Sequence, residues 1–471
     1  MSLTHCIRTL IDLKDKNISF PENYCEERVI KGRRTKLIYA TLTYKPVCCT
    51  RCGYLNTQFS IVKNGFLTSN IKWISTTHFP TYLVLKKQRF LCRECHGSFL
   101  AESTEIAKHC FISNRLKQSI AFELEDNSSR KDIAKRHFIS DTTVLRVLVT
   151  RGKSCLNRFD SLPAHLCFDE FKSVKRVEGK MSFIYCDAIT HGLIDILPDR
   201  KLVTLRAHFL RYSLKKRSKV QSIVVDMNAG YFTLAKELFP NANVIIDRFH
   251  LVQLLTVALN KTRIQLMNQF KRWKPEEMKV YRKLKRYWKL LLQDSQKVNY
   301  TDYQYHRLFR KVMPHSEIVD YLLSLNSTLK ATYTCYQDLL YALSQNNSDL
   351  LKSVLSSPHE QVSDYMSTAL QILRKHEERI RNTFQSKRSN GPLEGSINKI
   401  KVIKRTAYGY ASFFNYKYRI LISFQEKEKT IWTSIGSDRL RLYSIIHPQN
   451  LTNNPILKIQ RQQMREAIKR L

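Results

Sequence analysis

The chain has 471 residues, of which 43% are hydrophobic, and this is enough for about three domains with apolar cores. Lys and Arg number 79 against 40 Asp and Glu, which gives a formal net charge of +39. So large a positive charge favours a nucleic-acid partner, because it attracts and captures polyanions. No stretch approaches ~18 uninterrupted apolar residues, so the composition excludes a protein that spans the membrane.

The cysteines favour metal binding over disulfides. The first 20 residues carry charges within their apolar run and lack a secretory cleavage site, so we expect a cytoplasmic protein. Thiols stay reduced in that compartment. The 12 cysteines are then expected to be buried apolar residues or metal ligands.

Residues 1–105 contain short β-like runs and two CxxC pairs. Each pair curls the backbone so that both thiolates point at one spot, and two pairs supply the four soft ligands of a tetrahedral Zn²⁺ ion. The 39 residues between the pairs are β-like, which predicts a zinc ribbon with one structural Zn²⁺ ion. Cys48 is an alternative to the first ligand, and four idle cysteines are the other interpretation. The predicted ligands are Cys49, Cys52, Cys92 and Cys95.

Residues 110–155 have a helical pattern, with two short helices separated by a turn near Phe138. The pair resembles a helix-turn-helix (α), in which Ser140 caps the second helix and that helix enters the major groove of DNA. Phe138 stands where Gly often lies and resists a positive φ, so we expect a different turn geometry. An ordinary pair of packed helices is the alternative interpretation. The candidate DNA contacts are Thr142, Thr143 and Arg146.

Residues 163–250 alternate short apolar runs with helical segments, which predicts a mixed α/β sheet. Three of the runs end in an acid, and parallel strands place such acids side by side at one edge of a sheet. These acids are Asp169, Asp226 and Asp247. Clustered carboxylates raise one another's pKa unless cations join them, so we expect a Mg²⁺ or Mn²⁺ site for phosphate chemistry. A helix cap or a loop hydrogen bond is the alternative role, above all for Asp247.

The segments between the first two acids predict further strands. Residues 180–190 and 191–200 have the pattern of two strands, and residues 203–212 that of part of a third. Glu170 follows Asp169 directly, so its side chain is expected on the opposite face of its strand.

A helix is predicted after Gly391 and Pro392. At about 100° per residue, a carboxylate, an amide and two cations share one face, and three isoleucines share another that can dock on the sheet. The polar face consists of Glu394, Asn398, Lys401 and Arg405, and the candidate DNA contacts of this helix are Asn398, Lys401, Lys404 and Arg405. A solvated basic helix with one Glu is the alternative interpretation.

Residues 251–425 have mainly helical patterns and the strongest basic runs. Residues 271–311 contain 13 Lys and Arg against 4 acids, an excess suited to the DNA backbone. The patterns at 281–292, 305–313 and 363–384 predict helices. Residues 426–471 form a basic C-terminal extension to which no function is assigned.

Taken together, these motifs resemble those of the ISL3 family of bacterial insertion-sequence transposases, from about residue 45 to residue 425. The motifs are CTRCG with QRFLCRECHGSF, FDEFKS, VVDMNAGYF, IIDRFHLVQ and SNGPLEGSINKIKVIKRTAYGY. The resemblance implies a multidomain protein, with a zinc ribbon (β), a helix-turn-helix and a ribonuclease H-like DDE catalytic core at 163–425. It also implies an all-helical insertion in that core, at about residues 270–385.

The same resemblance implies the site residues and the activity. The catalytic triad would be Asp169, Asp226 and Glu394, holding two Mg²⁺ or Mn²⁺ ions, with Asp247 and His250 as auxiliary residues. The protein would bind double-stranded DNA at the terminal inverted repeats and at the target, then cleave it and transfer the strand. It would act as a homodimer or larger synaptic assembly near the bacterial nucleoid, away from membranes. The alternatives are a non-catalytic DNA-binding regulator and a structure-specific ribonuclease H-like nuclease.

Overall fold

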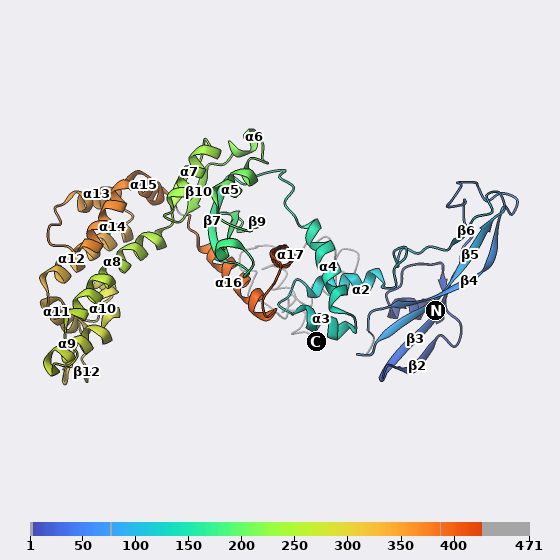
Figure 1. Cartoon of the computed structure of the whole chain (residues 1–471), viewed down its shortest axis with the longest axis horizontal. Coiled ribbons are helices and arrows are strands. Elements are labelled where there is room, and N and C mark those ends of the chain that lie inside the picture. The colour runs from blue at the N-terminus through green and yellow to red at the C-terminus, as the bar shows by residue number, and fades with distance from the viewer. Residues whose placement is uncertain (1–2, 76–77, 387, 426–471) are drawn as a thin grey trace, which may run out of the picture. The chain divides into compact units, whose positions relative to one another are not determined.

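The computed structural model describes residues 3–75, 78–386 and 388–425 (Figure 1). The described residues up to Phe424 form one compact unit, and the predicted extension at 426–471 lies outside the described residues. No helix in the described ranges is long and apolar enough to cross a membrane.

The N-terminal part is a six-stranded sheet with a short helix packed against it. The strands follow the order β1-β3-β5-β4, with β2 beside β3 and β6 beside β5, and only the β3–β5 pair is parallel. Trp73 lies in the core of this part and donates its indole N–H to the carbonyl of Ile11 at 3.1 Å. The β-rich prediction is confirmed. The elements are α1 (Leu3–Leu10), β1 (Ile18–Ser19), β2 (Cys25–Ile30), β3 (Arg33–Leu42), β4 (Ile61–Lys72), β5 (Thr81–Cys92) and β6 (Ser98–Leu100).

Three helices follow: α2 (Asn114–Glu123), α3 (Arg130–His137) and α4 (Asp141–Ser154). The hydroxyl of Ser140 accepts the backbone N–H of Thr143 at 3.2 Å, so the predicted N-cap of α4 is confirmed. Phe138 ends α3 in the left-handed conformation, with φ 53°. The expectation of a different turn geometry was wrong: the turn has the geometry that Gly would give, although a Phe side chain resists it. The amino group of Lys72 lies 5.6 Å from the centroid of the Phe138 ring.

The central sheet has five strands in the order β11-β10-β7-β8-β9. Strands β7, β10 and β11 are parallel, and β8 and β9 run antiparallel to their neighbours. One expectation was wrong: residues 203–212 contribute to helix α5, because Leu205, His208 and Phe209 are buried at helical spacing. The elements are β7 (His165–Lys172), β8 (Met181–Asp187), β9 (Leu193–Leu197), α5 (Leu202–Phe209), α6 (Leu214–Arg217), β10 (Ser222–Val225), α7 (Ala229–Leu238) and β11 (Asn243–Ile246).

A mainly helical region follows β11, as predicted, but it is not all-helical. Residues 305–313 were expected to form a helix and instead contribute to a hairpin of β12 and β13, whose turn has Arg310 at φ 52°. Both strands are short and largely exposed, which explains why no strand pattern marks them. The elements are α8 (Arg248–Gln269), α9 (Pro275–Arg286), α10 (Trp288–Leu292), β12 (Gln304–His306), β13 (Lys311–Met313), α11 (His315–Ser324), α12 (Ser327–Ser344), α13 (Ser348–Ser356), α14 (Asp364–Lys375) and α15 (Glu377–Gln385).

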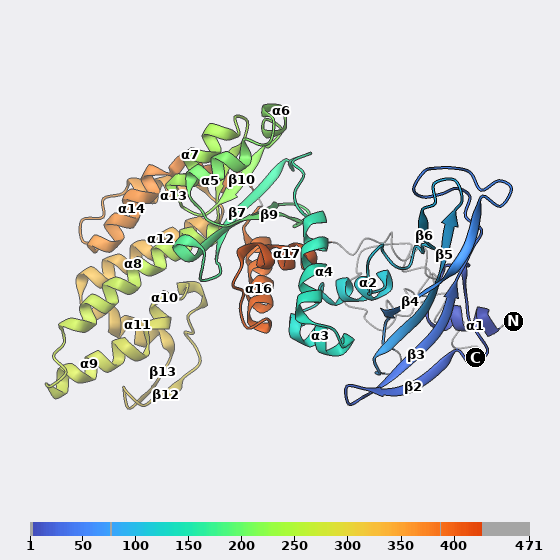
Figure 2. The same cartoon turned by 45° about the vertical axis from the view of Figure 1, so that its right-hand side comes forward.

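The described chain ends with α16 (Gly391–Thr406) and α17 (Phe413–Phe424), which cover one face of the central sheet (Figure 2). The predicted isoleucine face of α16 is confirmed, because Ile397, Ile400 and Ile403 are buried against β7, β8, β10 and β11. The other face of the sheet packs on α5, α7 and the core of the helical region.

Helix α17 belongs to two cores. Its Tyr416 and Ile420 pack under the sheet, whereas Tyr418 and Ile422 pack against α2, α3 and α4. The approach is closest at Gly152 of α4, where a Cβ atom would lie 2.3 Å from the Cβ of Tyr418. Only glycine therefore allows α4 and α17 to lie this close together.

Gly152→Ala is expected to destabilise the protein by about 1–3 kcal/mol, because a methyl group there overpacks the contact between α4 and α17. Thermal unfolding followed by circular dichroism measures the change. Gly395→Ala in α16 is the matched control: nothing lies within 4 Å of its added methyl group. That variant should be neutral or stabilised by up to about 1 kcal/mol, the difference in helix propensity. Equal midpoints for the two variants would contradict the close approach.

Candidate functional site

The strand register aligns the three predicted aspartates. Val224 lies opposite Cys167, and Ile246 lies opposite Val225. Continued by two residues, the pairing of β10 with β7 brings Asp226 opposite Asp169. Continued by one residue, the pairing of β10 with β11 brings Asp226 opposite Asp247. Strand β7 itself continues to Lys172 along β8, so Asp169 marks the end of its pairing with β10 rather than the end of the strand. The side-by-side row predicted from the sequence is confirmed.

All three aspartates point to the face of the sheet that α16 covers. They follow Cys167, Val224 and Ile245 by two residues, and those three side chains lie in the core beneath α16. Because side chains two apart share a face of a strand, the acids share it too. Glu170 lies on the opposite face, as predicted, where its carboxylate bonds Arg200 and the hydroxyl of Tyr231.

The acids perturb one another. Burial and the neighbouring charge of Asp226 raise the pKa of Asp169 to about 7. Burial also raises the pKa of Asp247. Negative charge on this edge is therefore unfavourable unless a cation or a proton joins the carboxylates.

Asp226 is held by two donors. The Nε2 atom of His250 lies 2.7 Å from its Oδ1 atom, and the side-chain amide of Asn390 donates to the same oxygen at 3.3 Å. The hydrogen bond to Asp226 raises the pKa of His250. Both donors reach Oδ1, which leaves Oδ2 available to a ligand. His250, predicted as an auxiliary residue, thus lies in direct contact with the row of acids.

Asn390 is the site residue that the sequence analysis missed. Its backbone N–H donates to Asp247 at 3.1 Å, and its side-chain amide donates to the carbonyl of Phe168 at 3.1 Å. It is buried, and no described donor reaches its Oδ1 atom. The available signal was its place before the Gly-Pro that begins α16. Asn390 joins the start of α16 to all three parallel strands.

Glu394 lies in the first turn of α16, and its backbone N–H donates to the carbonyl of Asn390 at 3.0 Å. Its side chain is exposed. Within the described ranges, only a cysteine group brings three or more potential metal ligands within 4.8 Å of one another. The structure therefore places Glu394 on the helix over the aspartates, without bringing its carboxylate that close to both Asp169 and Asp226.

The exposed face predicted for α16 is present, since Asn398, Lys401 and Arg405 are exposed in line with Glu394. Lys404 differs from the other candidates. Its amino group donates to the backbone carbonyls of Lys172 and Ser173, and burial lowers its pKa. Lys404 thus ties α16 to the end of β7.

The candidate DNA contacts on α4 are divided in the same way. Thr142 and Arg146 are exposed, and Thr143 is half-buried. The hydroxyls of both threonines lie within 2.9 Å of Ser140 Oγ, so they take part in the cap of α4. Arg146 is the exposed candidate whose side chain takes no part in this cap.

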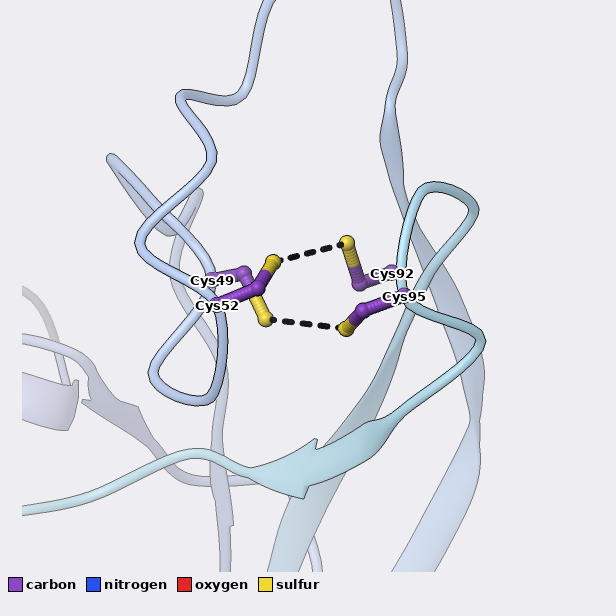
Figure 3. Close-up of side chains that lie close together, drawn as sticks. All are labelled: Cys49, Cys52, Cys92 and Cys95. Atoms are coloured by element: carbon purple, nitrogen blue, oxygen red, sulfur yellow. Dashed lines mark hydrogen bonds between the residues drawn. The ribbon is translucent and has the colours of Figure 1, made fainter.

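The four predicted cysteines converge at the N-terminal sheet (Figure 3). The Sγ atoms of Cys49 and Cys95 are 3.7 Å apart, and those of Cys52 and Cys92 are 3.9 Å apart. Four thiolates around Zn²⁺ at about 2.3 Å lie about 3.8 Å from one another, so the spacing fits a tetrahedral zinc site. Cys48 is not part of the group, and the alternative that it replaces Cys49 is wrong.

The backbone prepares one of these thiols for a metal. Hydrogen bonds from the backbone N–H groups of Cys52 and Arg51 lower the pKa of Cys49 to about 6. The thiolate, which is the form that binds Zn²⁺, is therefore favoured at neutral pH. The donor set, its spacing and this pKa all suit a structural zinc ion.

Two family models match the chain. One describes a transposase, the ISL3 DDE family, and matches residues 166–420. The other describes the zinc finger of transposases IS204, IS1001, IS1096 and IS1165 and matches residues 45–95. The chain belongs to the ISL3 transposase family. The family prediction made from the motifs is confirmed, and so is that of a zinc ribbon.

Two relatives differ in how much they share with this ISL3 protein. It is 23% identical over 383 residues to the transposase for insertion sequence element IS1001 of Bordetella parapertussis, across 80% of this chain and 88% of that protein. It is 38% identical over 117 residues to a protein of Lactococcus lactis subsp. lactis named ATP-dependent protease, across 24% of this chain and 37% of that protein. The chain thus matches only about a third of the second relative, and that match carries no function.

Cys95→Ser is expected to release zinc, because three thiolates and a hydroxyl hold it far less tightly than four thiolates do. Zinc per protein, measured by mass spectrometry of the metal, should fall well below one. Cys48→Ser, which changes the neighbour of a ligand, should keep one zinc. Loss of zinc from both variants alike would show that the four predicted cysteines are not the ligand set.

Asp169→Asn is expected to change how stability depends on pH. Because the pKa of Asp169 is raised in the folded state, its contribution to stability is present below about pH 4 and is lost as pH rises through about 7. At about 1.4 kcal/mol per pKa unit, the wild type should lose up to about 4 kcal/mol across this window in Mg²⁺-free buffer. The variant should lose less, and the exposed control Asp302→Asn should behave like the wild type. Urea unfolding at pH 4 and pH 8 measures the difference, and parallel pH profiles for all three would contradict it.

Proposed function

We propose that the protein is a DNA transposase that binds the terminal inverted repeats of an insertion sequence and catalyses metal-dependent cleavage and strand transfer. The observation that carries this proposal is the row of aspartates on the sheet face covered by α16, in a member of the ISL3 transposase family. The strand order β11-β10-β7-β8-β9 supports a ribonuclease H-like core around that site.

The residues of the site fit Mg²⁺ or Mn²⁺, which prefer oxygen ligands. Burial and the charge of Asp226 raise the pKa of Asp169, and the Oδ1 atom of Asn390 is a buried acceptor without a described donor. A divalent cation would relieve the repulsion between the carboxylates. Asp169, Asp226 and Glu394 would hold two such ions. Bound there, the ions would activate the attacking oxygen and stabilise the leaving oxygen of a phosphodiester.

The neighbours of the acids act as positioning residues in this proposal. His250 and Asn390 donate to one oxygen of Asp226 and so fix the direction of the other. Asn390 also anchors the first turn of α16 to Asp247, which orients the helix that carries Glu394. A rigid arrangement of this kind reduces the reorganisation needed when substrate binds.

DNA would approach along the exposed face of α16. The phosphate backbone is attracted by Lys401 and Arg405, and the positive end of the α16 dipole lies at its N-terminus beside the acids. Lys404 is left out of this interface, because it bonds the end of β7. The basic segment at 271–311 offers further contacts with the DNA backbone.

The N-terminal modules would recognise the repeats. Two short consecutive helices, α3 and α4, and the exposed Arg146 on the second of them support a helix-turn-helix in this proposal. The zinc ribbon precedes them in the chain and would bind beside them. Because two ends of the element are joined in transposition, the active form is proposed to be a homodimer or a larger synaptic assembly.

Glu394→Gln is expected to lower cleavage of DNA from the ends of the protein's own element by more than about 100-fold. Loss of a mere supporting partner of a metal ligand already costs about 10- to 100-fold, and a ligand should cost more. Cleavage with Mn²⁺ on labelled end DNA measures the rate, and binding is measured separately by gel shift. Glu360→Gln, an exposed acid in the loop before α14, is the matched control and should cleave normally.

The wild type separates the remaining functions in the same assay. Binding of the repeats without any cutting would favour a regulator, and cutting without repeat preference or strand transfer would favour a structure-specific nuclease. Normal cleavage by Glu394→Gln would remove this residue from the proposed triad.

A further inference from the structure

The exposed face of α16 extends beyond the residues already discussed. Glu394, Asn398, Lys401 and Arg405 follow one another at spacings of three or four, so they form one line along α16, and Tyr408 follows in the turn directly after the helix ends at Thr406. The line begins over the aspartates and ends at the C-terminal end of α16. We call these five residues the α16 track.

Tyr408 is the unusual member of the track. Its side chain is 96% exposed, and its φ of 55° lies in the left-handed region that most residues avoid. Its ring makes no hydrogen bond or ring contact with any residue that the structure describes. Neither packing nor backbone conformation explains a tyrosine here, because glycine would satisfy both better.

The neighbouring tyrosine shows the contrast. Tyr410 stacks on Tyr416 with ring centroids 4.9 Å apart, and burial raises its pKa. The two tyrosines flank Gly409, whose φ is 96°. Tyr410 thus supports the fold from the inside of the loop, whereas Tyr408 projects into solvent from its outside.

The track connects the two parts of the molecule that are proposed to hold DNA. The catalytic acids lie at its start, and the loop at its end leads into α17, which packs on α4. From Glu394 to Thr406, the last residue of α16, the helix rises about 18 Å, at about 1.5 Å per residue. At about 3.4 Å per base pair, this is the length of about five base pairs, and Tyr408 lies in the turn beyond it.

We propose that Tyr408 stacks on a base of the bound DNA, as a wedge about six base pairs from the phosphate at the catalytic acids. This inference rests on the proposed function. Lys401 and Arg405, which lie between Glu394 and Tyr408, would bind the phosphate backbone of the DNA. The ring of Tyr408 would enter a base step that opens beside the α16 track. A bend at this step would allow one duplex to contact both the acids and α4.

The test uses end DNA that carries 2-aminopurine at single positions four to eight base pairs from the cleavage site. Wild-type protein is expected to raise the fluorescence at one or two neighbouring positions, since unstacking relieves quenching. Tyr408→Ala should abolish this rise and weaken binding about 5- to 100-fold, the loss expected for one stacked base. Tyr408→Phe should keep both, because it keeps the ring.

Two further variants separate stacking from folding. Tyr408→Gly should leave the thermal midpoint unchanged or raised, while it loses the fluorescence signal. Tyr410→Ala should lower the midpoint, because it removes a packed ring. A lowered midpoint for Tyr408→Gly would mean that the ring serves the fold, and this would overturn the proposal.

The outcomes also distinguish this inference from the proposed function. If the wild type cleaves end DNA and Tyr408→Ala retains the fluorescence rise, the stacking proposal fails and the transposase proposal stands. If the wild type neither binds nor cleaves end DNA, the proposed function fails first. A rise at every position alike would indicate general melting of the DNA and would also overturn a wedge at one step.

Discussion

Like charges held in a row are the constraint on which the site depends. The parallel register of β7, β10 and β11 fixes Asp169, Asp226 and Asp247 next to one another, whatever their electrostatic cost. Neighbouring donors offset part of the repulsion between these carboxylates. His250 and the side chain of Asn390 contact Asp226, and the backbone N–H of Asn390 donates to Asp247. The carboxylates are therefore offset only in part by neighbouring donors, which is the state that the proposed cation site would require.

The residues that could be predicted are those whose role follows from short-range pattern. The apolar runs before the acids, the isoleucine face of α16 and the paired CxxC motifs all encode their surroundings within a few residues. Asn390 could not be found in this way, because its partners lie more than 140 residues earlier in the chain. The same holds for Lys404, whose pattern on a helix gives no sign of the carbonyls that it bonds.

The errors of secondary structure have local physical causes. Residues 203–212 alternate enough to suggest a strand, but a helix buries three of their side chains together. The hairpin of β12 and β13 buries little, so its sequence carries no alternating pattern, and the left-handed Arg310 at its turn is not a residue type that marks turns. Phe138 shows the same limit, because packing can impose a backbone conformation that its residue type disfavours.

The shared helix α17 has a consequence for synthesis of the protein. The helices α2, α3 and α4 leave the ribosome roughly 260 residues before Tyr418 and Ile422, which complete their core. At about 5–20 residues per second, that delay is on the order of tens of seconds. A nascent or prematurely terminated chain would therefore present an unfinished core of α2, α3 and α4 with an open apolar face. Synthesis and packing of α17 would complete that core.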